Sequence, residues 1–210
     1  PREVDQVNGE GGFSHVEPGD FLLIEVGERG ELLVKNLHGT KTEPIRIQPS
    51  SFRNSVRIKS DGNYGITFRN CSHVHLSGWQ GQEDVYGIQI VDLPAEGSVG
   101  ISLTDFSTNI EISHLEIGDC GFAGILAKTD PKCNDPRTWR ENGFVQENTV
   151  IHHCYIHDTG GEGIYVGHNA YQGTTEDDCD LIYPHVLKGV DIHSNRIERT
   201  GWDGIQVTSV

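Results

Sequence analysis

The sequence contains no methionine, no run of 18 apolar residues and few basic side chains. No segment therefore has the length and hydrophobicity of a membrane-spanning helix. Lys and Arg number 16 against 31 Asp and Glu, and the resulting net charge of −15 disfavours nucleic acid and anionic membranes as partners. The five cysteines include no CxxC pair, which argues against a zinc site of that type, and their odd number leaves at least one thiol unpaired within the chain.

Glycine, by contrast, is abundant, with 26 residues, and it recurs in front of isoleucine. The repeated dipeptide occurs at Gly65-Ile66, Gly87-Ile88, Gly100-Ile101, Gly124-Ile125, Gly163-Ile164 and Gly204-Ile205. The last three belong to a longer repeat, because residues 112–125, 151–164 and 192–205 align without a gap. Apolar residues alternate with polar ones within each repeat, and a period of two indicates β-strands rather than helices.

The repeat predicts a solenoid. Nothing between the short strands has room for a crossover helix, so parallel pairing requires the chain to coil, with each rung covering the next. We expect a single all-β domain, a right-handed parallel β-helix, with residues 1–50 as its first coil and 51–210 as repeating rungs. An antiparallel β-sandwich with glycine-rich turns would also explain the Gly-Ile steps, but not the ungapped repeat.

The segment ahead of the repeats resembles the first coil of the pectate-lyase-like superfamily. A "PGD" strand at Pro18–Val26 is followed by Gly30–Asn36, Gly39-Thr40 and Pro44–Gln48, the order found in that family. The resemblance covers about residues 16–210 and implies the parallel β-helix fold and an extracellular polysaccharide setting. It does not imply one reaction, because the superfamily includes lyases, hydrolases, epimerases, phage tailspikes and adhesins.

The chain ends inside its repeating pattern, at Gly204–Val210, without a polar cap. An uncapped rung exposes strand edges and core. We therefore expect the chain to be a piece of a longer solenoid.

Two insertions lengthen the later repeats, at residues 128–147 and 167–188. Both follow the same strand of consecutive rungs, so a solenoid would project them from one edge, one above the other. Each contains one cysteine, and we expect a disulfide between Cys133 and Cys179, which favours an oxidising compartment. Cys154 aligns with an inward-facing leucine and is expected to be a buried thiol.

The insertions also carry the candidate catalytic residues. β-Elimination on a uronic acid needs a base for the C5 proton and a cation for the carboxylate. Candidates for these roles are Lys128, Arg137, Arg140, His168 and Tyr171. Hydrolysis instead needs two carboxylates flanking the scissile bond. Candidates for that chemistry are Asp130, Asp177, Asp178 and Asp180.

Substrate contacts are predicted beside these residues. Alternation places Gln89, Tyr165 and Gln206 on the outer face of one sheet, where they would form a glycan floor together with Trp139 of the first insertion, or else a solvated surface. The acidic run 176–180 offers Asp177, Asp178 and Asp180 as oxygen ligands for calcium, although its spacing also fits an acidic turn.

Histidines cluster on adjacent rungs. In register, His153 lies over His114, and His152 lies between Ser113 and His193. Stacked imidazoles could bind a transition metal, but the pattern favours a polar outer ladder.

These observations favour a polysaccharide-active enzyme, with lyase ahead of glycoside hydrolase, working at an extracellular, cell-surface or periplasmic location. The partner would be a polysaccharide or oligosaccharide, and calcium is the one cofactor that the residues indicate. The alternative is a non-catalytic glycan-binding or structural module of a larger surface protein.

Overall fold

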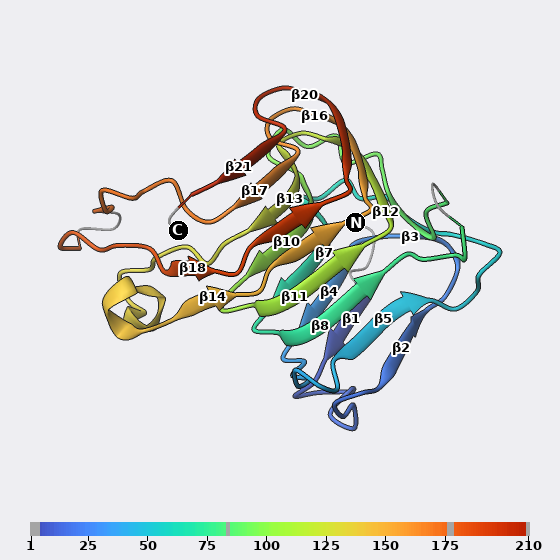
Figure 1. Ribbon diagram of the computed structural model, residues 1–210, viewed down its shortest axis with the longest axis horizontal. Helices are drawn as coiled ribbons and strands as arrows, with labels where there is room; N and C mark the ends of the chain where they lie inside the picture. Colours follow the sequence, from blue (N-terminus) through green and yellow to red (C-terminus); the bar gives the residue numbers. More distant parts are fainter. Residues whose placement is uncertain (1–4, 83–84, 176–178, 209–210) are drawn as a thin grey trace.

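The chain folds into a parallel β-helix whose rungs each pass through three sheets (Figure 1). The computed structural model describes residues 5–82, 85–175 and 179–208. Every pairing between two named strands is parallel, as the repeat predicted. This excludes the antiparallel sandwich. No helix of the described ranges is long and apolar enough to cross a membrane.

The strands fall into three stacked sheets and one short pair. Sheet A contains β1 (Asp5–Asn8), β4 (Leu32–Lys35), β7 (Tyr64–Arg69), β10 (Val99–Thr104), β13 (Ala123–Ala127), β17 (Ile164–Val166) and β21 (Ile205–Val207). Sheet B contains β2 (Phe21–Ile24), β5 (Ile45–Pro49), β8 (Ser72–Ser77), β11 (Thr108–Ser113), β15 (Val150–His152) and β19 (Asp191–His193). Sheet C contains β3 (Gly27–Arg29), β6 (Val56–Ile58), β9 (Ile88–Ile90), β12 (Leu115–Cys120), β16 (Tyr155–Thr159) and β20 (Arg196–Thr200).

The core is a set of aliphatic columns that run between the sheets. Ile66, Ile101, Ile125 and Ile164 are in register on neighbouring strands of sheet A, and each is fully buried. Each buried isoleucine contributes about 1.5–3 kcal/mol relative to an exposed one, so the column stabilises the stacking of rungs. The isoleucine of the repeated dipeptide is therefore a core residue, except Ile205 on the last rung, which is 48% exposed.

Steric crowding between rungs explains why the first residue of the dipeptide is glycine. A Cβ on Gly100 would lie 2.6 Å from the carbonyl oxygen of Gly124 and 2.4 Å from a methyl group of Ile117. A Cβ on Gly124 would lie 2.7 Å from the Gly163 oxygen in the same way. These positions leave no space for a side chain between rungs, which explains why glycine recurs there.

One dipeptide lies in a different sheet from the others. Ile88 pairs with Val56 and Leu115 in sheet C, whereas the other Gly-Ile isoleucines lie in sheet A. The prediction that Gln89 shares an outer face with Tyr165 and Gln206 is therefore wrong. The dipeptide therefore places an isoleucine in the core, and it does so in more than one sheet.

Asparagines turn the chain from sheet A towards sheet B. Asn36, Asn70, Asn109 and Asn148 all have φ between 47° and 55°, the left-handed region that asparagine tolerates. Their amides bond from rung to rung, with Asn70 donating to Asn36 at 2.9 Å and Asn148 to Asn109 at 2.7 Å. These ladders satisfy the polar groups of the bend.

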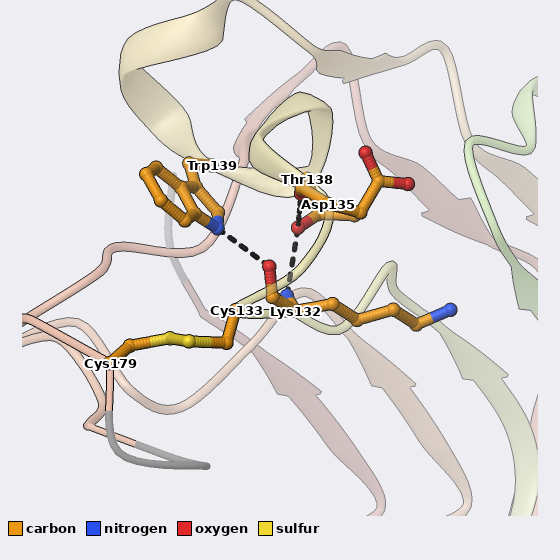
Figure 2. Close-up of a disulfide and its surroundings, with 6 residues drawn as sticks. All are labelled: Lys132, Cys133, Asp135, Thr138, Trp139 and Cys179. Carbon is orange, nitrogen blue, oxygen red and sulfur yellow. Dashed lines mark hydrogen bonds between the residues drawn. A yellow bond between two sulfur atoms is a disulfide. The ribbon is translucent and has the colours of Figure 1, made fainter.

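The two insertions project from one edge, as predicted. The first follows β13 and the second follows β17, and they pair through β14 (Val145–Glu147) and β18 (Val186–Lys188). The first also contains the short 3-10 helices η1 (Pro136–Thr138) and η2 (Arg140–Asn142). The predicted disulfide between Cys133 and Cys179 is present, with Cα atoms 5.6 Å apart (Figure 2). Cys154 is buried, also as predicted, and burial raises the pKa of its thiol to about 12.

Candidate active site

Neighbouring strands bring two predicted catalytic residues together at the loop edge. Lys128 follows β13 and His168 follows β17, and both contact Asp130. Lys128 Nζ lies 2.6 Å and His168 Nε2 3.3 Å from Asp130 Oδ1, and Lys128 Nζ lies 5.9 Å from the centre of the Tyr165 ring. We call Lys128, Asp130, Tyr165 and His168 the loop-edge cluster.

The charges of the loop-edge cluster compensate one another. Burial opposes ionisation of Asp130, but hydrogen bonds from His168 and Lys128 outweigh it and lower the pKa of Asp130 to about 2. His168 Nδ1 accepts a hydrogen bond from the Ala170 N–H at 3.0 Å, so the Nε2 atom carries the proton that faces Asp130. The Lys128 ammonium thus has a carboxylate partner already.

Two members of the loop-edge cluster, Tyr165 and His168, are buried. Tyr165 was predicted to face solvent as part of a glycan floor, but only 5% of it is exposed. Its hydroxyl accepts a hydrogen bond from the Asn169 N–H at 3.2 Å, so the second insertion begins directly beside its phenol group. His168 is 8% exposed. Tyr165 is therefore not an open sugar-stacking surface, while Gln206, beside it in register on β21, is half-buried.

The other predicted loop residues have separate partners. Arg137 is exposed, pairs with Asp135 at 2.7 Å and lies over Phe106. Arg140 lies over Tyr183, and the Tyr171 side chain is 67% exposed. Trp139 is half-buried near the disulfide, where its indole N–H donates to the Lys132 carbonyl at 2.8 Å (Figure 2). None of these recorded contacts joins Arg137, Arg140 or Tyr171 to the loop-edge cluster.

The predicted calcium ligands fall largely outside the described ranges. Asp177 and Asp178 lie in the stretch that the structure does not describe, and Asp180 is exposed. Within residues 5–82, 85–175 and 179–208, no three His, Cys, Asp or Glu side chains are grouped in a way that could hold a metal ion. The calcium site stays a prediction.

The histidines form the expected ladder on sheet B. The His114 and His153 rings stack at 4.9 Å, and so do those of His152 and His193. His152 Nε2 lies 3.2 Å from Glu111 Oε1. Burial, together with the neighbouring His153 and His152, lowers the pKa of His114 to about 4, which keeps this ring neutral near pH 7.

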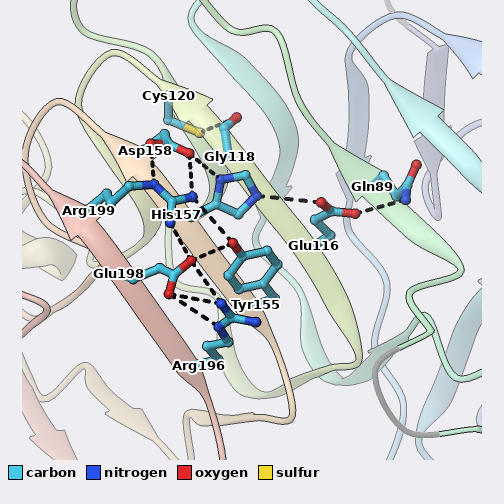
Figure 3. A network of polar contacts seen from close by, with 10 residues as sticks. All are labelled: Gln89, Glu116, Gly118, Cys120, Tyr155, His157, Asp158, Arg196, Glu198 and Arg199. Atoms are coloured by element: carbon cyan, nitrogen blue, oxygen red, sulfur yellow. Dashed lines mark hydrogen bonds and ion pairs between the residues drawn. The ribbon is translucent and has the colours of Figure 1, made fainter.

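A second polar centre lies on the outer face of sheet C, which Figure 3 shows. One column of side chains crosses neighbouring strands there, because Gln89, Glu116, Tyr155 and Arg196 are in register. The column borders a cleft of about 550 Å³, here called the sheet C cleft. The residues that line it are Arg53, Ser55, Gln80, Val85, Tyr86, Gln89, Glu116, Tyr155 and Arg196.

Tyr155 is held at both its hydroxyl and its ring. The hydroxyl donates to Glu198 Oε1 at 2.7 Å and accepts from Arg199 Nη2 at 3.3 Å (Figure 3). The Arg196 guanidinium lies 4.6 Å from the ring centre. Hydrogen bonds from Tyr155, Arg199 and Arg196 lower the pKa of Glu198 to about 2, so Glu198 is an ionised acceptor for the phenol proton.

His157 supports the same tyrosine from the next outward position of β16. Its ring stacks on Tyr155 with centroids 4.3 Å apart, and its Nδ1 lies 2.6 Å from Asp158 Oδ2. The ring occupies the space above Gly118, where an added Cβ would lie 2.4 Å from it. Arg199 clamps Asp158 through two nitrogens, at 2.7 and 2.8 Å. Gly118 therefore makes room for the ring that packs against Tyr155.

The cleft also contains two arginines, of which one has a carboxylate partner among the described residues. Arg196 pairs with Glu198 at 3.0 Å, but exposed Arg53 makes no ion pair with any carboxylate that the structure describes. Gln89 Nε2 donates to Glu116 Oε2 at 2.8 Å beside it. The arrangement can bind an anion at Arg53, hydrogen-bond hydroxyl groups through Gln89 and Glu116, and exchange a proton at Tyr155.

The sequence analysis missed Tyr155, Arg196 and Arg53 as site residues, although one signal was present. Glu116, Tyr155 and Arg196 occupy the same position of the three aligned repeats. A column of outward residues at one position of a solenoid repeat becomes a continuous surface strip.

Comparisons with known proteins agree with the fold. No protein-family model and no curated protein sequence matches the chain. A solved structure, an alginate lyase from Paenibacillus sp. str. FPU-7, matches with a TM-score of 0.52 and 18% sequence identity over 96% of this chain. The match spans 63% of the length of that protein. At this identity the likeness supports the parallel β-helix architecture.

Proposed function

We propose that this protein is a polysaccharide lyase that cleaves a uronate-containing glycan by β-elimination in the sheet C cleft. The observation that carries the proposal is that one cleft contains an accessible proton-transfer group, Tyr155, and a cation, Arg53, that makes no ion pair with a carboxylate of the described residues. Elimination next to a carboxylate needs both groups. The likeness to an alginate lyase supports the reaction class, since alginate is a polymer of uronates.

The roles follow from the contacts. Arg53 would pair with the uronate carboxylate and stabilise the charge that develops when the C5 proton leaves. Tyr155 would react as the phenolate, its proton having left to solvent: it would take the C5 proton, the C5–H electrons would form the C4–C5 double bond, and the C4–O bond would break. The leaving oxygen would take this proton from Tyr155, which restores the phenolate for the next cycle. Arg199 and Glu198 act as positioning residues for the phenol.

The loop-edge cluster is the second candidate site for the same reaction. It holds Lys128 and His168, which were predicted from the sequence, but its lysine is bonded to Asp130 and its tyrosine is buried. The disulfide between the insertions supports an oxidising, extracellular or periplasmic location.

The test is the rise in absorbance at about 235 nm that an unsaturated uronate product gives, measured with alginate and other polyuronates, with and without calcium. We expect Tyr155→Phe to lower kcat by at least about 100-fold, and Arg53→Gln to raise KM by about tenfold. The matched controls Tyr171→Phe, in the second insertion, and Arg137→Gln, in the first, remove the same groups and should change neither constant.

Other outcomes distinguish the alternatives. Loss of activity in Lys128→Ala or His168→Ala, with Tyr155→Phe fully active, would transfer the reaction to the loop-edge cluster. New reducing ends without the absorbance rise would indicate hydrolysis. Binding without any product from the folded chain would favour the non-catalytic glycan-binding module.

A further inference from the structure

A second cleft lies on sheet B, on the other side of the segment that joins β8 to β9. It has a volume of about 250 Å³ and is here called the sheet B cleft. The residues that line it are Arg46, Ile47, Gln48, Phe52, His75, Ser77, Trp79, Glu111 and Ser113. No residue of this list borders the sheet C cleft. The proposed reaction therefore leaves this surface without a role.

Two aromatic side chains give the sheet B cleft apolar walls. Trp79 is 40% exposed and Phe52 is 65% exposed, although both are large hydrophobic residues. Trp79 is fixed in place, because the His114 ring packs against it at 4.7 Å and a Cβ on the preceding Gly78 would lie 2.2 Å from the His114 carbonyl oxygen. An exposed but immobilised indole is a rigid surface for the apolar face of a sugar ring.

The floor of the cleft is polar. Ser77 and Ser113 are in register on β8 and β11, and their hydroxyls lie 3.2 Å apart. Glu111 lies on the same face, with His75 Nε2 at 3.5 Å. Hydroxyls, a carboxylate and an amide close to an aromatic wall are the groups that hydrogen-bond sugar hydroxyls.

Arg46 gives the cleft its charge selectivity. Its guanidinium lies over the Phe21 ring at 5.4 Å and donates to the Pro44 carbonyl at 3.4 Å, but it makes no ion pair with a carboxylate in the part of the chain that the structure describes. The protein as a whole has a net charge of −15 and repels anions. An unpaired guanidinium on a polar floor between aromatic walls is therefore a local site for a carboxylate, which it can bind through two nitrogens.

We propose that the sheet B cleft binds one uronate residue of an acidic oligosaccharide, with the sugar carboxylate on Arg46 and the apolar face of the ring on Trp79. This proposal rests on the substrate class of the proposed function, but not on its elimination chemistry. Trp79 and Tyr86 form an antiparallel bridge across the connecting segment, so one segment presents an aromatic residue to each cleft. The sheet B cleft is thus a non-catalytic subsite next to the reacting one.

The three tryptophans give a readout at single residues, since each has one indole N–H. ¹⁵N-labelled Tyr155→Phe protein, chosen to prevent cleavage, is titrated with hexasaccharides of mannuronate, guluronate and galacturonate at up to millimolar concentration. We expect the Trp79 indole signal, assigned with Trp79→Phe, to shift and saturate, while the signals of Trp139 and Trp202 stay in place. Arg46→Gln should weaken the affinity measured at Trp79 by about tenfold, and Arg137→Gln, the same change in the first insertion, should not.

Three results would overturn the proposal. In the first, none of the three acidic hexasaccharides shifts the Trp79 signal. In the second, Arg46→Gln binds them as tightly as its parent does. In the third, the neutral cellohexaose shifts the signal with the same affinity. Failure of the lyase proposal is seen separately, as absence of the 235 nm product in unsubstituted protein. That absence would leave the indole titration unchanged.

Discussion

The loop-edge cluster and the sheet C network contain the same kinds of group, a tyrosine, a histidine, carboxylates and cations, yet they differ in access. Tyr165 and His168 are 5% and 8% exposed, in a cluster built from the starts of two insertions. Tyr155 lies on a strand of the solenoid and borders a cleft of about 550 Å³ that also contains Arg53, which has no ion pair within residues 5–82, 85–175 and 179–208. The composition of a polar cluster therefore does not identify a reaction site. Space for a substrate and a cation without a partner are needed as well.

Removing the disulfide should give the largest difference between its effect on stability, through the insertions, and its effect on activity in the sheet C cleft. The double variant Cys133→Ser with Cys179→Ser loses a link between positions 46 residues apart, which we expect to lower the free energy of unfolding by about 2–4 kcal/mol. The link restrains the loops of the loop-edge cluster and none of the strands of sheet C. Elimination by the folded variant should therefore remain within about twofold of the parent.

Thermal unfolding gives the stability of that variant, and the absorbance assay at a temperature where it is folded gives its activity. The buried thiol Cys154 provides the control, since Cys154→Ala affects the core of the solenoid and leaves the disulfide intact. Activity that disappears from folded double variant, but not from Cys154→Ala, would contradict the assignment to the sheet C cleft.

Whereas the cysteine variant affects the loop-edge cluster, Gly118→Ala should affect the sheet C cleft. The new methyl group would lie 2.4 Å from the His157 ring, so the ring must move away from Tyr155. We expect a cost of about 1–3 kcal/mol and a melting temperature lower by about 2–10 °C. Elimination should fall by more than tenfold, because a small displacement of a proton-transfer group has large kinetic effects.

The matched control is Gly97→Ala, since a Cβ at Gly97 meets no atom within 4 Å. Unchanged activity in Gly118→Ala, with the lowered melting temperature seen, would mean that the stack on Tyr155 serves packing alone. The pair of variants thus separates a steric effect on the fold from one on the phenol.

The solenoid and the disulfide between its insertions could be predicted from the sequence because both depend on repetition. Ile101 and Ile125 recur with their glycines, and each inserted segment has one cysteine at the same edge. Register also placed His153 over His114 correctly. These features require only that equivalent positions of successive rungs stack.

The candidate site was harder to predict, for three physical reasons. Gly87-Ile88 has the local signature of the other dipeptides but bends the chain into sheet C, so Gln89 was assigned to the wrong face. Tyr165 points outward by alternation, yet the second insertion begins over it, a tertiary contact that no local pattern reports. Arg53 lies outside the aligned repeats, and only the folded chain places it on the same cleft as Tyr155.

The smallest expected effect is that of removing the Asp130 carboxylate, whose charge compensates that of Lys128. Asp130 has its pKa lowered from 3.8 to about 2, because the hydrogen bonds from His168 and Lys128 outweigh its burial. A group whose pKa is lower in the folded state stabilises the fold above its unfolded pKa, and this stability is lost as the pH falls from about 4 to about 2. Since the Asp130 side chain is 52% exposed, screening by solvent limits the contribution to a few tenths of a kcal/mol and at most about 1 kcal/mol.

Asp130→Asn should therefore unfold with a shallower loss of stability between about pH 4 and pH 2 than the parent protein, as measured by urea unfolding at each pH. Asp61→Asn, which removes an exposed carboxylate that forms no ion pair with the residues the structure describes, should keep the parent slope. Asp130→Asn also tests where the reaction occurs, because it leaves Lys128 without its carboxylate partner. If the reaction occurs in the sheet C cleft, elimination at neutral pH should not change. An increase or a loss of more than about tenfold would mean that the Lys128 charge takes part in the reaction, and would return the loop-edge cluster to first place.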